Sequence, residues 1–216
     1  MEKPTQQTVP VAERFTRRIS ELREKLTGFD PYRLAEMTGA SYQPIEGDKG
    51  EFSLLLWDRP VMVFFPDLSI FQSPSFEPVS PINQALLLYY FTTADGTPPS
   101  GEWISFSELP DGRFYNQAFQ GYTGHELSKF FQNDHPSFEQ AARLLGGTPQ
   151  NLGDSSFSFK VLPRVDLLVV YWQGDEDIPA SFQILFDASA KNYLPTDAYA
   201  ILGSKLTQRL LAARSK

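Results

Sequence analysis

The sequence contains no cysteine, and that absence alone excludes several classes of protein. Disulfide scaffolds, thiolate zinc sites, iron–sulfur clusters and cysteine nucleophiles all require thiols from the chain that carries them. Histidine is scarce as well, with only His125 and His135. They do not have the i, i+4 spacing of a helical metal pair, so we predict no metal site. We expect both to be exposed caps, His125 in the first turn of a helix and His135 in a turn before Pro136.

Long apolar runs and positive charge are also lacking. The longest apolar segments, LLLYYF and LLVVYW, are much shorter than the roughly 20 residues that cross a bilayer, and the N-terminal segment has no apolar leader. The formal net charge is −7, which gives no basic footprint for nucleic acid. These features predict a cytoplasmic protein that neither binds nucleic acid nor enters a membrane.

Common catalytic and cofactor motifs are missing too. There is no Gly-x-Ser-x-Gly elbow, no Gly-x-Gly-x-x-Gly fingerprint and no Gly-Lys-Ser/Thr phosphate loop. The sequence therefore predicts no cofactor and favours a protein that is not an enzyme.

Aromatic residues, in contrast, are abundant: they make up 14% of the 216 residues and include 18 phenylalanines. A chain of this length and composition buries a sizeable core. We expect residues 1–10, which are polar and contain proline, to form a flexible arm before a single domain over residues 11–216. An apolar stripe at helical spacing predicts that the domain begins with a helix packed on its body. The stripe consists of Val11, Phe15, Ile19, Leu22 and Leu26.

The order of apolar runs predicts an α+β fold. Residues 52–57 and 61–65 flank the turn Asp58-Arg59-Pro60, and residues 156–162 and 165–172 flank Pro163, so each pair indicates a β-hairpin. Residues 82–94 are apolar all round, as in a buried central helix. We predict a mixed or mostly antiparallel sheet from two hairpins with flanking helices. Both halves follow a hairpin with a capped helix, which leaves open a loosely duplicated β-β-α unit.

One acidic segment stands out between two apolar strands. Asp175, Glu176 and Asp177 lie in a row after Trp172, and Asp187 ends the next predicted strand. Adjacent side chains point in different directions, so a solvated turn explains the row better than a site does. The alternative is a pocket built from Asp166, Asp187 and the row, in which Asp187 acts as base or metal ligand and Asp175 and Glu176 assist. For Asp187 itself we expect a carboxylate that caps the amides of the following turn.

An aromatic band across the centre of the chain is the second candidate for a site. It contains Trp103, Tyr115 and Tyr122, interspersed with Asn, Gln and Gly. Core packing explains most of such a band, but mixed aromatic and amide side chains also line sites for flat organic molecules. We therefore name as candidate ligand-binding residues Trp103, Tyr115, Tyr122, Trp172, Asp175, Glu176 and Asp187.

These residues carry a resemblance to a known family. Over residues 32–211 the chain resembles an uncharacterised prokaryotic family catalogued as domain of unknown function 3786. The points of likeness are residues 103–106, Leu109-Pro110 with Gly112, Leu162-Pro163, the acidic row, residues 185–187 and Leu194-Pro195. The family has no established activity, so the resemblance implies no catalytic residues. Some of its members look joined to cysteine-rich iron–sulfur segments. This chain cannot ligate such a cluster, and any cluster would belong to a partner.

Three hypotheses for function follow. The first is a non-catalytic binding or accessory protein with a protein or small-molecule partner, and it rests on the missing motifs. The second is a carboxylate-dependent, metal-assisted enzyme built on the acidic segment. The third is a small-molecule sensor with an aromatic-lined pocket.

Overall fold

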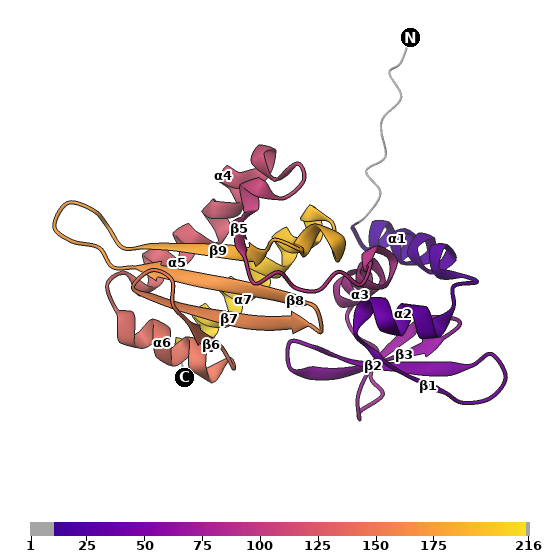
Figure 1. Ribbon diagram of the computed structural model, residues 1–216. Helices are drawn as coiled ribbons and strands as arrows, with labels where there is room; N and C mark the ends of the chain where they lie inside the picture. Colours follow the sequence, from indigo (N-terminus) through magenta and orange to yellow (C-terminus); the bar gives the residue numbers. More distant parts are fainter. Residues whose placement is uncertain (1–10, 215–216) are drawn as a thin grey trace, which may run out of the picture.

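The structure, a computed structural model, describes residues 11–214, so the arm predicted for residues 1–10 lies outside the described part. Figure 1 shows two sheets side by side, one built by the first part of the chain and one by the rest. Both sheets are wholly antiparallel, with four and five strands. The predicted α+β class is confirmed, and each predicted hairpin lies in a sheet of its own.

The first part of the chain forms a four-stranded meander with three helices. Its elements are α1 (Val11–Leu26), α2 (Pro31–Thr38), β1 (Ser41–Pro44), β2 (Gly50–Leu56), β3 (Arg59–Phe65), β4 (Ser69–Gln72) and α3 (Pro81–Thr93). α1 packs on α3. In α1, Ile19, Leu22 and Leu26 are buried as predicted, while the side chains of Val11 and Phe15 lie outside the described part. α3 is the predicted central helix, because its side chains are buried on nearly every side.

The turn between β2 and β3 differs from the prediction. It consists of Trp57 and Asp58 alone, because Leu56 pairs with Arg59 and the following proline already belongs to β3. Two-residue hairpin turns with positive φ at both positions match the twist of the strands. Trp57 and Asp58 have φ values of 52° and 60°. Burial of the Trp57 side chain offsets the unfavourable backbone conformation, which sequence propensity does not register.

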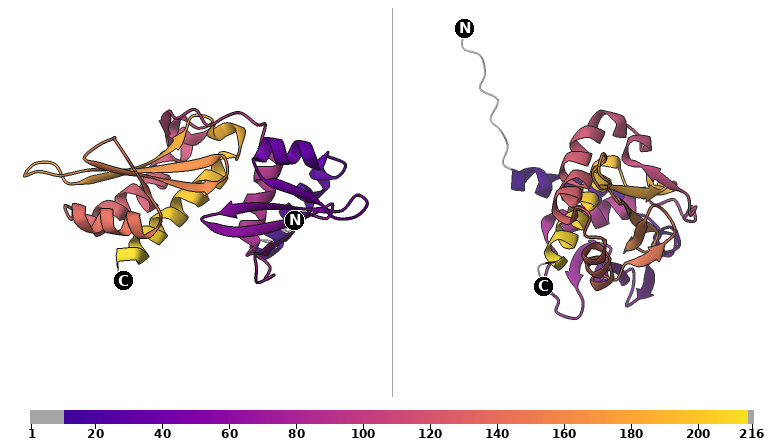
Figure 2. Two further views of the ribbon diagram at one scale, coloured as in Figure 1. Left: turned by 60° about the horizontal axis from the view of Figure 1, so that its bottom comes forward. Right: turned by 90° about the vertical axis from the view of Figure 1, so that its left-hand side faces the viewer.

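The second part of the chain forms a five-stranded sheet in the order β5-β9-β8-β7-β6. Its elements are β5 (Trp103–Ser105), a 3₁₀ turn η1 (Phe106–Glu108), α4 (Gly112–Tyr122), α5 (Gly124–Phe131), α6 (His135–Leu144), β6 (Thr148–Gln150), β7 (Ser155–Leu162), β8 (Val165–Trp172), β9 (Ser181–Asp187), η2 (Ala190–Asn192) and α7 (Thr196–Arg214). Figure 2 shows α6 and α7 on the same face of this sheet. The loosely duplicated unit stays a prediction, since the two sheets differ in strand number and order.

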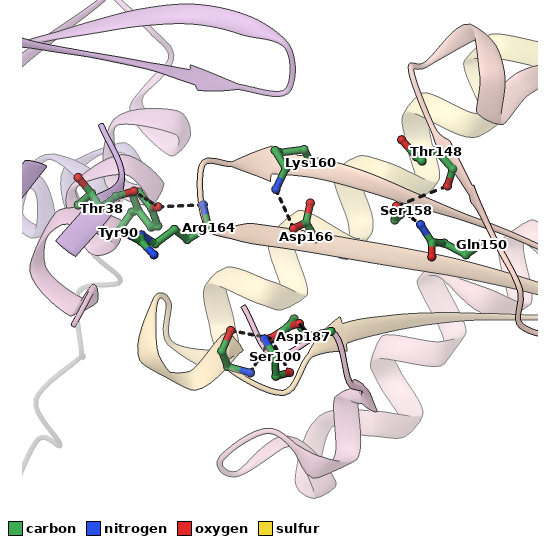
Figure 3. A network of polar contacts seen from close by, with 12 residues as sticks. Thr38, Tyr90, Ser100, Thr148, Gln150, Ser158, Lys160, Arg164, Asp166 and Asp187 are labelled. Carbon is green, nitrogen blue, oxygen red and sulfur yellow. Dashed lines mark hydrogen bonds and ion pairs between the residues drawn. The ribbon is translucent and has the colours of Figure 1, made fainter. Parts of the chain in front are cut away.

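The two parts meet at the tips of their hairpins. The N–H of Trp57 donates to the carbonyl of Val161 at 3.0 Å. The hydroxyl of Tyr90, on α3, donates to the carbonyl of Thr38 and accepts from the N–H of Arg164 at 3.2 Å, as Figure 3 shows. One continuous cluster of buried apolar residues extends through both parts. The assignment of residues 11–216 to a single domain stays a prediction.

The length and the apolar character of a helix decide whether it can span a membrane. Between residues 11 and 214, no helix combines the length and the apolar character that a bilayer crossing requires.

Candidate functional site

Asp187 lies at the end of β9 and binds two turns at once. One carboxylate oxygen accepts from the N–H of Ser189 at 2.8 Å, which is the capping bond predicted from the sequence. The carboxylate also accepts from the N–H groups of Ser100 at 2.9 Å and Gly101 at 2.7 Å, in the loop before β5 (Figure 3). Both serine hydroxyls donate to it as well. The carboxylate therefore fastens the loop before β5 to the end of β9.

The electrostatics of Asp187 agree with this structural role. Burial by itself would raise the pKa of the Asp187 carboxyl, since only 5% of the residue is exposed. The hydrogen bonds from Ser189, Ser100 and Gly101 outweigh burial and lower the pKa below its ordinary value. The group is thus a carboxylate near neutral pH, and hydrogen bonds from protein donors reach both of its oxygens, four at Oδ1 and one at Oδ2.

The acidic row lies at the other end of the hairpin. Asp175 accepts from the N–H groups of Asp177 at 2.9 Å and Ile178 at 2.8 Å, so it closes a local turn, and Glu176 beside it is exposed. This turn follows Trp172, which pairs with Ser181 at the start of β9, whereas Asp187 ends the same strand. Six residues of strand separate the two ends by about 20 Å. The structure does not bring the row and Asp187 together.

The remaining carboxylates give no metal cluster. Asp166, near the start of β8, pairs with Lys160 at 2.8 Å on the exposed face of the hairpin (Figure 3). Over residues 11–214, no three His, Asp or Glu side chains are grouped so that they could hold a metal ion.

Trp103 and Trp172 lie on the same side of the five-stranded sheet, near opposite ends of β9, and both have a packing role. They lie against Leu168, Val170 and Leu185, which form a small apolar cluster of their own on the five-stranded sheet. Trp103 also pairs with Asp187 across β5 and β9. Trp103, Trp172 and Asp187 therefore share one side of one sheet, where the two tryptophans cover an apolar patch.

The aromatic band divides into a buried half and an exposed half. Phe106 and Phe119 are buried, with ring centroids 4.1 Å apart in a stacked arrangement. On the outer side of α4, in contrast, Phe114 is 85% exposed and Tyr115 is 61% exposed, and Tyr122 two turns later is also exposed. Core packing thus explains Phe106 and Phe119. It does not explain the exposed side chains of Phe114, Tyr115 and Tyr122.

A hollow of 710 Å³ lies beside the start of α4. Phe114 and Tyr115 form part of its wall, and the opposite wall comes from the segment that enters α7. Its lining residues are Thr93, Pro110, Asp111, Phe114, Tyr115, Lys191, Leu194, Pro195, Thr196 and Asp197. A second, shallower hollow of 390 Å³ follows along α7 and includes Tyr122, Ala200 and Ile201. Together these two hollows and the exposed aromatic side chains of α4 are called the α4 face below.

The two histidines differ from each other. His125 is exposed at the start of α5, as predicted. His135 also begins a helix, but it is half-buried: its ring stacks on Tyr171 at 5.3 Å between centroids. Its Nε2 lies 3.2 Å from Oε1 of Glu139, within ion-pair range but without hydrogen-bond alignment. The exposed position predicted for His135 is therefore wrong, because the neighbouring sheet supplies a tyrosine that local sequence does not reveal.

Sequence reasoning missed one further group of residues. Trp57, Arg59, Lys205 and Arg209 come from distant parts of the chain and line a common groove. No spacing pattern connects a hairpin turn with the last helix, so only the fold could identify the group.

The fold defines this chain as an α+β protein with two antiparallel sheets, each covered by helices. The family model described as Domain of unknown function (DUF3786) matches residues 30–209, and the chain belongs to this family. The resemblance found in the sequence is thereby confirmed. Comparison with the curated proteins and with the solved structures found no match.

Proposed function

We propose that this chain is a non-catalytic binding protein whose α4 face docks a short segment of a partner protein. The observation that carries the proposal is the exposure of Phe114 and Tyr115 beside a hollow of 710 Å³. Aromatic side chains are costly to expose, and a cluster of them beside a concavity is typical of interaction surfaces. The predicted candidates Tyr115 and Tyr122 both belong to this surface.

The walls of the α4 face indicate the chemistry of the partner segment. In the larger hollow, Pro110, Leu194 and Pro195 offer apolar contact, and its lining holds two carboxylates, Asp111 and Asp197, beside one cation, Lys191. The net charge of −7 adds a long-range attraction for cations. The occupant we infer is a segment with apolar or aromatic anchor residues flanked by lysine or arginine.

The state of the acidic side chains supports a binding role over a catalytic one. Asp187 is occupied by backbone donors, Asp166 by Lys160, and Asp175 by its own turn. The carboxylate-dependent enzyme would need these groups to converge on one point. The cytoplasmic location and the prokaryotic origin stay predictions from the sequence.

Selection of peptides from a displayed random library against the full chain would test the proposal. Peptides that bind should be rich in apolar and basic residues and should bind the double variant Phe114→Ser, Tyr115→Ser at least tenfold more weakly. Both positions are exposed, so the variant should remain folded. Phe76→Ser is the matched control, because Phe76 is also 61% exposed but lies in the loop after β4, away from α4.

Removing two carboxylates of the α4 face provides a second part of the same experiment. Asp111→Asn with Asp197→Asn should weaken the selected peptides and reduce the salt dependence of their binding. Peptides that bind the double serine variant as tightly as the parent would contradict the proposal, and so would a library without binders. Binding of an uncharged aromatic compound at the same face, in the absence of peptide binding, would instead favour the small-molecule sensor.

A further inference from the structure

A separate groove of 420 Å³ lies where the β2–β3 turn approaches α3 and the last turns of α7. Its floor is apolar and its rim is formed by amide and basic side chains. The lining residues are Leu56, Trp57, Arg59, Val61, Gln72, Val79, Asn83, Lys205, Gln208, Arg209 and Ala212. The α4 face and this groove share only Lys205 and Gln208, at the border of the second hollow.

The charge of the groove is opposite to that of the chain as a whole. Arg59, Lys205 and Arg209 line it, and no carboxylate from residues 11–214 does. In the part of the chain described, none of the three cations forms an ion pair; the ammonium group of Lys205 donates to Oδ1 of Asn83, a neutral acceptor. Asp58 is the acidic group that influences Arg209, across the turn. Among the described residues these three cations have no ion-pair partner, and their meeting in one small groove of an acidic chain matches a polyvalent anion.

The pKa shifts of Lys205 and Arg209 agree with the lack of an ion-pair partner for either side chain in the described part of the chain. Burial lowers the pKa of the Lys205 ammonium group and that of the Arg209 guanidinium. For Arg209, Asp58 opposes the effect and Arg59 adds to it. Partly desolvated cations that repel one another are destabilising on their own, and a bound anion would relieve this.

Trp57 provides an independent observation in the same groove. It holds a left-handed backbone conformation in the β2–β3 turn, where a bulky residue is rare. The residue is only 9% exposed, and its indole Nε1 is buried without a hydrogen-bond partner. The guanidinium of Arg209 lies over the indole ring, 4.7 Å from its centroid. A strained turn thus holds an unsatisfied donor and orients an arginine, the combination found where ligands are bound.

We propose that the groove lined by Trp57, Arg59, Lys205 and Arg209 is a binding site for a small organic molecule that carries a polyvalent oxyanion. Arginine and lysine recognise the oxygens of phosphate esters and of di- or tricarboxylates alike. Asn83, Gln72 and Gln208 supply amide groups for its polar substituents, and 420 Å³ is within the range of small-molecule sites. The site does not depend on the partner-binding function proposed for the α4 face.

Titration calorimetry of the full chain with three probes would test the site: pyrophosphate, citrate and the monovalent anion acetate. We expect pyrophosphate or citrate to bind the parent at least tenfold more tightly than acetate does. Lys205→Gln and Arg59→Gln should each weaken that binding at least fivefold, and the pair should weaken it more. Arg113→Gln changes the net charge equally on the exposed side of α4, and binding should stay unchanged.

A second readout locates the ligand even if one variant folds poorly. In a ¹⁵N-labelled sample, the indole N–H resonance of Trp57, assigned with Trp57→Phe, should move on addition of the bound anion. The resonances of Trp103 and Trp172 should stay in place. A preference for pyrophosphate would identify a phosphate ester as the ligand class, and a preference for citrate a polycarboxylate.

Three results would overturn the site. They are no binding of either polyvalent anion at millimolar concentration, equal weakening by Arg113→Gln, and a Trp57 resonance that does not respond. The double serine variant of α4 should bind the anion like the parent, so failure of the peptide experiment and failure of this one are distinguishable.

Discussion

Asp187 and Asp175 begin from the same local motif and end in different roles. Each accepts a hydrogen bond from the backbone N–H two residues ahead, at 2.8 and 2.9 Å. Asp187 also accepts from Ser100 and Gly101, which are 87 and 86 residues away in sequence, and it is buried. Asp175 bonds only within its own turn and stays in solvent.

The comparison shows how burial, and hydrogen bonds to residues distant in sequence, change the contribution of the same local motif to stability. A buried carboxylate that leaves its partners would strand several desolvated donors, whereas an exposed one leaves its donors to water. The same holds for Tyr90, whose hydroxyl joins α2 to the β7–β8 turn across 52 and 74 residues of sequence. Stability should therefore depend on the residues that connect distant segments, and little on the acidic row.

The largest effect is expected for Asp187→Ala. The free energy of unfolding should fall by about 3 kcal/mol, because the buried N–H of Ser189 and the part-buried N–H of Gly101 lose a charged acceptor. Urea denaturation followed by circular dichroism measures the change. Asp187→Asn keeps one acceptor oxygen and should lose less. A loss of unfolding free energy no greater than that of a variant of the acidic row would contradict the contrast between the two aspartates.

Tyr90→Phe should have the next largest effect. Removing the hydroxyl leaves the carbonyl of Thr38 and the N–H of Arg164 without this partner, at a cost of about 1–2 kcal/mol. Tyr89→Phe is the matched control, since its hydroxyl accepts from Arg18 at 2.6 Å in a half-buried position. We expect the control to lose less in the same urea titration. Equal losses of unfolding free energy in the two variants would mean that the contact of Tyr90 with both parts of the chain does not add to stability.

Acid should reduce the contribution of Asp187. Its pKa is lower in the folded protein than the unfolded value of about 4, so its stabilisation is fully present above that pH and is lost as the pH falls through the folded pKa. The difference in unfolding free energy between the parent and Asp187→Asn should be constant near neutral pH and shrink below about pH 4. A difference that stays constant down to the acid limit would show that the charge of Asp187 does not matter.

The smallest effect is expected for the acidic row. Asp175→Asn, Glu176→Gln and Asp177→Asn together should leave the melting temperature unchanged or raise it slightly, because three exposed like charges repel one another. Asn at position 175 retains the turn acceptor. Adding Mg²⁺ or Ca²⁺ should stabilise neither form. A metal-dependent rise in melting temperature in the parent that disappears in the triple variant would make the row a metal site.

Local features of the structure follow well from sequence. The all-round apolar run predicted α3, the helical stripe predicted the burial of Ile19 and Leu22, and the residues after Asp187 predicted its capping bond. Each depends on neighbours within a few positions, where residue spacing translates directly into geometry. The predicted position of the β2–β3 turn was wrong. Burial of the Trp57 side chain outweighs the energetic cost of its positive φ, and a local pattern does not show this burial.

The candidate site was less predictable than the fold. Spacing alone could not separate the exposed Phe114 from the buried Phe119, which belong to one band and one helix. It also could not show that Trp172 covers an apolar patch on the sheet. Both outcomes depend on which elements pack against the band, and a single sequence does not specify those contacts.

By itself, the sequence determined that this protein has no thiol chemistry, that its strands and helices follow an α+β order, and that its net charge is acidic. The tertiary structure alone decided that Asp187 binds the loop before β5, and that Arg59 meets Lys205 and Arg209 in one groove. Composition and local periodicity are properties of short segments, which the chain carries into any fold. Convergence of residues that are 86 or more positions apart is set by how sheets and helices pack, and no local pattern encodes it.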